Sequence, residues 1–420
     1  MPGTVDRAAD PMIEWPLTGT LEVVVEAQPG DSHLKTNQTN DRPAGSRQPV
    51  DWDLAVATAR RLVRPGPQLT RAEADEVVSS LRVLAVEAER HVEDYTRLRP
   101  PPAAVTPIAV VDRSEWARSN VAGLRMITTP LLDQLADATK GSLSTAVGRR
   151  VTGVQLGSAL AYLAGKVLGQ YEVFLPPEEY GPTPTPARSD WADGPGPVGR
   201  LSLVAPNIAH AERQLGVVPR GFRLWVCLHE QTHRSQFTAV PWLRAHLESE
   251  IGAFIEATDL DPDVLADRLR SAVGALRGAV RDRGSDAPSV VEALQTPAQR
   301  AVLDRLQALM TLLEGHADQV MDAVGPRVVP TVADIRAKFD TRRSGGSPLD
   351  RFVRRLLGLD MKLRQYRQGG AFVRAVVAEA GVDGFNLVWQ SPATLPTQAE
   401  IADPGAWMAR VLGSRPSISA

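Results

Sequence analysis

The 420-residue sequence predicts a mainly α-helical protein with a little β structure, folded as two helical lobes of one integrated unit. Two capping-box spacings, Thr70 with Glu73 and Asp112 with Glu115, indicate helix starts at which side chain and backbone satisfy each other. Strand signals are sparse, and the best one in the core is at 201–205. The helical period is clearest after Thr70, where apolar residues recur three or four positions apart: Val77, Val78, Leu81, Leu84, Ala85, Ala88, Val92 and Tyr95.

The N-terminal part of the chain divides into two stretches of different composition. Residues 1–48 are rich in Pro, Gly, Thr, Asn and Asp, so we expect a mobile segment with one strand at 21–26. Residues 49–180 predict a helical region that is broken at 100–102 by three prolines. Within this region 154–168 is mostly apolar and predicts a buried core helix. A row of small residues four apart would let a neighbouring helix approach closely: Gly153, Gly157, Ala161, Gly165 and Gly169.

The second part of the chain begins after a loop. Residues 181–199 are dense in Pro and Gly and predict an exposed loop, after which 200–415 is again mainly helical. The strand at 201–205 is followed by a helix that ends at Gly216 and by a long helix after Pro219. Further helices are expected after Pro241, Asp261 and Thr296, the last one ending at Val324 before Gly325 and Pro326, with a loop at 281–288.

Composition and charge restrict the classes of partner. Lys and Arg number 47 against 49 Asp and Glu, a net charge of −2, so we expect no nucleic-acid partner. The single cysteine, Cys227, can form no internal disulfide, which favours a reducing compartment. Residues 1–20 lack the apolar core of a secretory signal, and 154–168 is too short to cross a bilayer. We therefore expect a cytoplasmic protein without membrane attachment, whose oligomeric state the sequence leaves open.

The sharpest chemical signal is at 229–233, where the sequence is His-Glu-Gln-Thr-His, an instance of His-Glu-x-x-His. Residues four apart share one face of a helix, so both imidazoles can reach one metal ion while the glutamate acts as a general base. No proline interrupts 220–240, which favours a helix there. The motif predicts a Zn²⁺ site with His229 and His233 as ligands and Glu230 as the catalytic residue.

Catalytic zinc takes three protein ligands and leaves one position for water, so a third ligand is needed. Glu314 is the best candidate, because it lies beside the apolar stripe of a predicted helix, where a carboxylate needs a cation as partner. Asp318, one turn later, is placed to accept the second ring N–H of a ligand histidine. His316 is the alternative third ligand. A weaker alternative is the acidic group on the helix after Pro241: Glu248, Glu250 and Glu256.

Together these residues predict hydrolysis of a peptide or amide bond. Zinc and Glu230 would activate water for attack on the carbonyl, and the same carboxyl group would then protonate the leaving amine. Arg364, Tyr366 and His316 are candidates for stabilising the oxyanion, because each can donate a hydrogen bond. The alternative is a helical binding or scaffold protein whose zinc site is structural or vestigial. A closed site with four protein ligands would favour that alternative.

Several blocks of the sequence resemble a family of bacterial zincin-like metallopeptidases: Leu203–Ile208, Leu228–Phe237, Pro241–Arg244, Leu312–Asp322 and Asp360–Tyr366. The similarity extends over about 51–410. Members are mostly uncharacterised, and some are linked by genome context to biosynthesis of a deazaflavin coenzyme. The resemblance implies a zincin-like catalytic region at 200–415, in which the two histidines of the motif bind zinc and Glu230 is the base. Glu314 and Asp318, on a later helix, are similar to the acidic pair of gluzincins.

Overall fold

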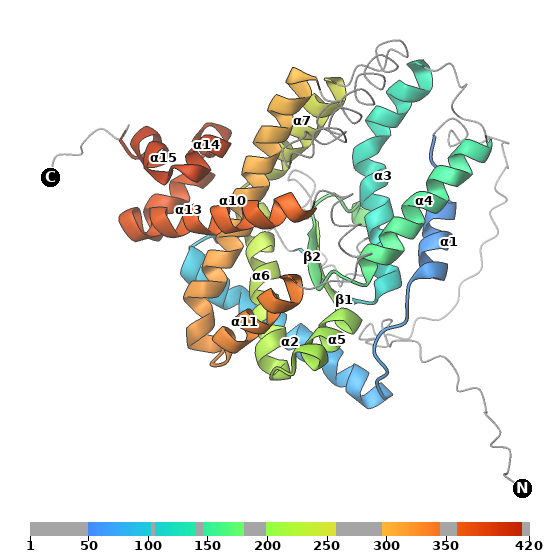
Figure 1. Cartoon of the computed structure of the whole chain (residues 1–420), viewed down its shortest axis with the longest axis horizontal. Helices are drawn as coiled ribbons and strands as arrows, with labels where there is room; N and C mark the ends of the chain where they lie inside the picture. Colours follow the sequence, from blue (N-terminus) through green and yellow to red (C-terminus); the bar gives the residue numbers. More distant parts are fainter. Residues whose placement is uncertain are drawn as a thin grey trace, which may run out of the picture.

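The structure is a computed structural model that describes residues 49–101, 106–138, 146–179, 199–257, 296–344 and 359–413. Within these ranges the chain is mainly α-helical with a small three-stranded sheet, as the sequence predicts (Figure 1). Other expectations lie outside the described residues: the segment 1–48 with its strand, the loop at 181–199 apart from its last residue, the helix after Asp261 and the loop at 281–288.

The described helices are α1 (Trp52–Leu62), α2 (Arg71–Thr96), α3 (Arg113–Ala138), α4 (Ala146–Ala164), α5 (Ala205–Leu215), α6 (Pro219–Ala239), α7 (Leu243–Glu256), α10 (Pro297–Val328), α11 (Val332–Ser344), α13 (Leu359–Phe385), α14 (Gln398–Ala402) and α15 (Pro404–Val411). The strands are β1 (Ile108–Val111), β2 (Gly169–Glu172) and β3 (Arg200–Val204). None of the helices within the described ranges is both long enough and apolar enough to cross a bilayer.

The capping signals of the sequence mark helix starts in the structure. Before α2, the Glu73 carboxylate accepts the Thr70 N–H at 2.7 Å, and the Thr70 hydroxyl accepts the Glu73 N–H at 3.3 Å. Before α3, Asp112 accepts the N–H of Glu115 at 2.7 Å. These bonds satisfy N–H groups that a helix cannot satisfy within its own first turn.

The helix that carries the acidic candidates, α10, begins as predicted and ends later than predicted. Thr296 and Gln299 form a reciprocal capping box at its start. Its end is one turn beyond the expected stop at Gly325 and Pro326. The proline removes one N–H close to the helix end, and the Gly325 carbonyl still accepts the N–H of Val329 at 2.7 Å, so the last turn persists.

The sheet has the strand order β1-β3-β2, with β3 in the centre. β1 runs parallel to β3, with Ala109 opposite Ser202, and β2 runs antiparallel to it, with Gln170 opposite the same serine. The sequence predicts β3 and misses the other two strands, because four residues carry too few alternating positions to show a period of two. β2 is an edge of the described sheet, and it contacts α6.

The row of small residues brings α4 close to α1. A Cβ on Gly157 would lie 2.7 Å from the Cβ of Thr58 and would also meet the carbonyl of Ala55, so only glycine fits at this contact. The expectation of a buried helix at 154–168 is wrong for its outer face, where Val154 is 42% exposed. The last residue of the row, Gly169, does not lie on α4 but belongs to β2.

Helix α6 lies near the middle of the molecule, between α10 and α13 on one side and α3 and α4 on the other (Figure 1). Its apolar side belongs to a core shared with α2, α5 and the C-terminal half of α10. A second core joins α7, α10 and α13, and a third joins α1, α3 and α4. The buried residues that hold α6 in place include Phe222, Leu224, Cys227 and Leu228.

Candidate metal centre

The two histidines of the motif lie on one face of α6. Their positions four residues apart bring the rings of His229 and His233 to a centroid separation of 4.7 Å, with the ring planes at 88° to each other. The two Nε2 atoms are 3.2 Å apart. Both imidazoles therefore direct the same ring nitrogen toward one point.

Glu314 reaches this point from α10. Its Oε2 lies 3.6 Å from the Nε2 of His229, and its Oε1 lies 3.7 Å from the Nε2 of His233. The side chains of the three residues are between 13% and 27% exposed, so the cluster is open to solvent on one side. In the described part of the chain, this is the group of three metal-ligating side chains whose ligand atoms come within 4.8 Å of one another.

The distances fit a tetrahedral zinc ion. Zinc binds imidazole nitrogen and carboxylate oxygen at about 2.0–2.2 Å, which separates two tetrahedral ligand atoms by about 3.3 Å. The three separations of 3.2, 3.6 and 3.7 Å are close to that value. Two imidazoles and one carboxylate also form a donor set typical of catalytic zinc, in which one coordination position stays open. These three residues could therefore hold Zn²⁺ in an open site.

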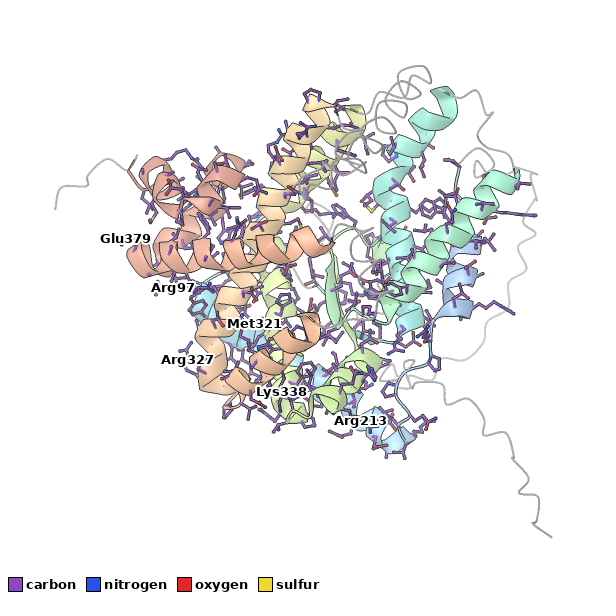
Figure 2. The ribbon with its side chains drawn as sticks, in the orientation of Figure 1. Arg97, Arg213, Met321, Arg327, Lys338 and Glu379 are labelled. Carbon is purple, nitrogen blue, oxygen red and sulfur yellow. The ribbon has the colours of Figure 1, made fainter. Side chains whose placement is uncertain are left out.

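The second ring nitrogens of the two histidines contact different groups. His229 Nδ1 lies 3.3 Å from the thioether sulfur of Met321, the α10 residue labelled in Figure 2. His233 Nδ1 lies 3.0 Å from Oε1 of Gln236, one turn later on α6. Sequence reasoning misses Gln236. The available signal was an amide three residues after a candidate ligand, but its role depends on what α10 places beside it.

His316, the alternative third ligand, is not part of the cluster. Only 2% of it is exposed, and its Nδ1 lies 3.0 Å from Nε2 of Gln236. Its ring packs against Phe385 and Trp389, with centroids 5.1 and 5.5 Å away. Burial, and secondarily the nearby His233, lower the pKa of His316 to about 3, so its imidazole stays neutral at physiological pH.

The remaining acidic candidates have other surroundings. Asp318 lies one turn beyond Glu314 on α10, where its Oδ1 accepts a hydrogen bond from Arg336 of α11 at 3.4 Å. Its role toward a ligand histidine stays a prediction. The glutamates of α7 do not join the cluster: Glu248 pairs with Arg244, Glu250 pairs with Arg305, and Glu256 lines an apolar cavity of about 240 Å³ between α7 and α3.

Two of the oxyanion candidates, Arg364 and Tyr366, have side chains that lie outside the described part of the chain.

Cys227 is fully buried in the core on the other side of α6, and burial raises the pKa of its thiol. The thiol is therefore kept protonated and away from the cluster.

Glu230 is buried beside the edge strand. It is 6% exposed, and its carboxyl group lies so close to Gly169 of β2 that a Cβ there would be 2.9 Å from Oε1. Burial, and secondarily the negative charge of Glu314, raise the pKa of Glu230 to about 8. A carboxyl group with a pKa near neutrality can both accept and release a proton at physiological pH.

The fold and the cluster together define a candidate metal-dependent hydrolase, in which a His-Glu-x-x-His helix meets a glutamate from a distant helix. The model of the zincin-like metallopeptidase family matches residues 50–408, and the chain belongs to this family. A crystal structure of a candidate hydrolase with a novel fold, from Chloroflexus aurantiacus, is 32% identical, with a TM-score of 0.61. The similarity covers 87% of this chain and 100% of that one. No curated protein matches the chain. The family and the similar structure support a hydrolase role, and the family implies a metal.

Proposed function

We propose that this protein is a zinc-dependent metallopeptidase or amide hydrolase of the cytoplasm. The observation that carries the proposal is the convergence of His229, His233 and Glu314 beside the buried carboxyl group of Glu230. His229 and His233 would bind the metal through Nε2, and Glu314 through its carboxylate. Zinc bound there would supply a Lewis acid that polarises a substrate carbonyl and acidifies water.

Glu230 is the general base in this proposal. With its pKa raised to about 8 in the metal-free protein, the carboxyl group is sensitive to nearby charge, and a bound cation favours its ionised form. The ionised carboxylate takes a proton from the attacking water. It then gives this proton to the leaving amine, so that Glu230 ends the cycle as it began.

The edge of the sheet favours a peptide as the substrate. Val204 donates its N–H to the carbonyl of Leu168 at 2.9 Å, so by the alternation of antiparallel pairing the backbone of Gly169 faces away from β3. An extended peptide that adds to this edge of the described sheet would lie next to Gly169 and therefore next to Glu230. Main-chain pairing of this kind binds peptides with little dependence on sequence.

The number of ligands distinguishes this function from its rival, a scaffold protein with a structural zinc site. Structural zinc sites are closed by four protein ligands, whereas the described cluster offers three and is open to solvent. The observation favours an enzyme. The oxyanion donor stays a prediction, with Arg364, Tyr366 and His316 as the candidates.

Zinc content and hydrolysis of a peptide mixture, measured on the same preparations, test the proposal. We expect one zinc per wild-type chain and release of new amino termini from the peptides. Glu230→Gln should keep the zinc and lose hydrolysis, whereas Glu314→Ala should bind zinc much more weakly. A wild-type protein that takes up no zinc, or a Glu314→Ala variant with unchanged affinity, would contradict the proposed site.

A further inference from the structure

We infer that Gln236 is a positioning residue that fixes the tautomer of His233, so that the Nε2 lone pair of this histidine points toward the metal position. The inference rests on the proposed function, because it assigns His233 as a ligand. Gln236 is fully buried, on the same helix as His233, and its amide contacts groups from both α6 and α10.

The orientation of the Gln236 side-chain amide follows from its contact with a backbone carbonyl oxygen, which can accept a hydrogen bond but cannot donate one. Nε2 of Gln236 lies 3.0 Å from the backbone carbonyl oxygen of Leu313, and a carbonyl oxygen cannot donate a hydrogen bond. The amide nitrogen must therefore be on that side. With the nitrogen fixed, the amide oxygen is left on the side of His233, at 3.0 Å from Nδ1.

An amide oxygen is also only an acceptor, so Nδ1 of His233 must carry the hydrogen. A neutral imidazole has one N–H, and the proton on Nδ1 leaves Nε2 with its lone pair. That Nε2 is the atom 3.2 Å from Nε2 of His229 and 3.7 Å from Glu314. The metal-binding form of His233 is thus set before any metal arrives.

His316 completes the fixation. The second N–H of the Gln236 amide points to Nδ1 of His316 at 3.0 Å, so that both N–H groups of the amide have an acceptor. Rotating the amide by half a turn would place its oxygen against the Leu313 carbonyl and lose these bonds. The imidazole of His316 is itself held between Phe385 and Trp389, so the acceptor cannot easily move away.

A spectroscopic measurement tests this directly. Long-range ¹H–¹⁵N correlation spectra of the metal-free wild-type protein, recorded above the usual histidine pKa of about 6.5, report which ring nitrogen carries the proton. The signal of His233 is assigned by comparison with His233→Ala. We expect protonation at Nδ1. A proton on Nε2 in the metal-free wild type would overturn the inference, whatever the protein hydrolyses.

Zinc affinity provides the second test, measured by competition with a chromophoric chelator. Gln236→Leu should bind zinc about 10–100-fold more weakly, the usual effect of removing the group that orients a ligand histidine. The matched control is Gln231→Leu. Gln231 is also a buried glutamine of α6, and it donates to a backbone carbonyl, that of Ala85, at 2.8 Å. The Gln231→Leu variant should be less stable than the wild type and should bind zinc with unchanged affinity.

A conservative variant separates positioning from packing. Gln236→Glu keeps an acceptor for His233 but loses the donor to Leu313, so it should be less stable and still show the proton on Nδ1. Gln236→Leu should lose the preference for this tautomer. If wild type and Gln236→Leu bind zinc equally well, the inference fails while the proposed function stands. If the wild type binds no zinc, the proposed function fails. The tautomer measurement then still decides whether Gln236 holds the proton of His233 on Nδ1.

Discussion

The backbone of Gly169 and the carboxyl group of Glu230 are in direct contact across β2 and α6. A Cβ added to Gly169 would lie 2.6 Å from Cγ and 2.7 Å from Cδ of the glutamate. Those atoms belong to the far end of a flexible side chain, so the carboxyl group would move while the backbone stays in place. The small residue at this position therefore determines where the proposed general base lies.

Gly169→Ala should lower the rate of hydrolysis by about 100-fold and leave zinc binding intact. The reason is that a displacement of about 1 Å in a catalytic group is enough for such a loss. The measurement is kcat on a peptide substrate together with zinc content. Gly252→Ala is the control, because a Cβ on Gly252 meets no atom within 4 Å. A Gly169→Ala variant with wild-type kcat would argue against Glu230 as the base.

Glu230 predicts how the stability of the metal-free protein depends on pH. Burial and the charge of Glu314 raise its pKa from 4.5 to about 8 in the folded state. Between these two values the folded protein binds more protons than the unfolded chain, so the free energy of unfolding falls as the pH rises. This contribution is fully present below 4.5 and is lost as the pH passes through the folded-state pKa of about 8.

Urea denaturation at about pH 6 and about pH 8.5 measures this effect. Metal-free wild type should lose more stability between the two conditions than metal-free Glu230→Gln, whose amide does not titrate. Equal pH slopes for the two proteins would rule out a raised pKa at this position.

Removing zinc should lower the melting temperature of the wild type. A ligand that binds only the folded state stabilises it by about 4 kcal/mol when its free concentration is about 1,000 times Kd. Thermal unfolding with and without a strong chelator gives the shift. Glu314→Ala, which lacks one proposed ligand, should show little difference between the two conditions. A chelator effect of the same size in both proteins would remove Glu314 from the ligand set.

The contact between α4 and α1 predicts a purely structural effect far from the cluster in sequence. Gly157→Ala should destabilise the protein by about 1–3 kcal/mol, because the added Cβ would meet the backbone of α1. Gly165→Ala is the matched change, since a Cβ there has its nearest neighbour, the Tyr162 carbonyl, at 3.6 Å. Urea denaturation should separate the two, and equal stability would contradict the close packing of these helices.

The sequence predicts the helices well because their signals are local. The helix starts after Thr70 and Thr296 are indicated by residues within a few positions of each other, and the structure has a helix beginning after each. β1 and β2 are stabilised by pairing with β3, which is distant in sequence, so no local pattern indicates them. Gly169 illustrates the difference: its spacing fits a helical row, while its place in the structure is an edge strand.

The sequence predicts those parts of the candidate site that depend only on residue chemistry and helical spacing. His229 and His233 lie on one helix, so their convergence follows from the period alone, and Glu314 follows from its place beside an apolar stripe. Gln236 could not be found in this way. Its role depends on the Leu313 carbonyl and the His316 ring, which only the packing of α10 on α6 brings to it.

The most direct test of the account is the coordination of zinc in the wild-type protein, measured by X-ray absorption at the zinc edge. The account predicts two imidazoles, one carboxylate and one oxygen from solvent, at about 2.0–2.2 Å. In Glu314→Ala the carboxylate contribution should disappear. Four protein ligands in the wild type, or a spectrum that Glu314→Ala leaves unchanged, would contradict an open site built by His229, His233 and Glu314.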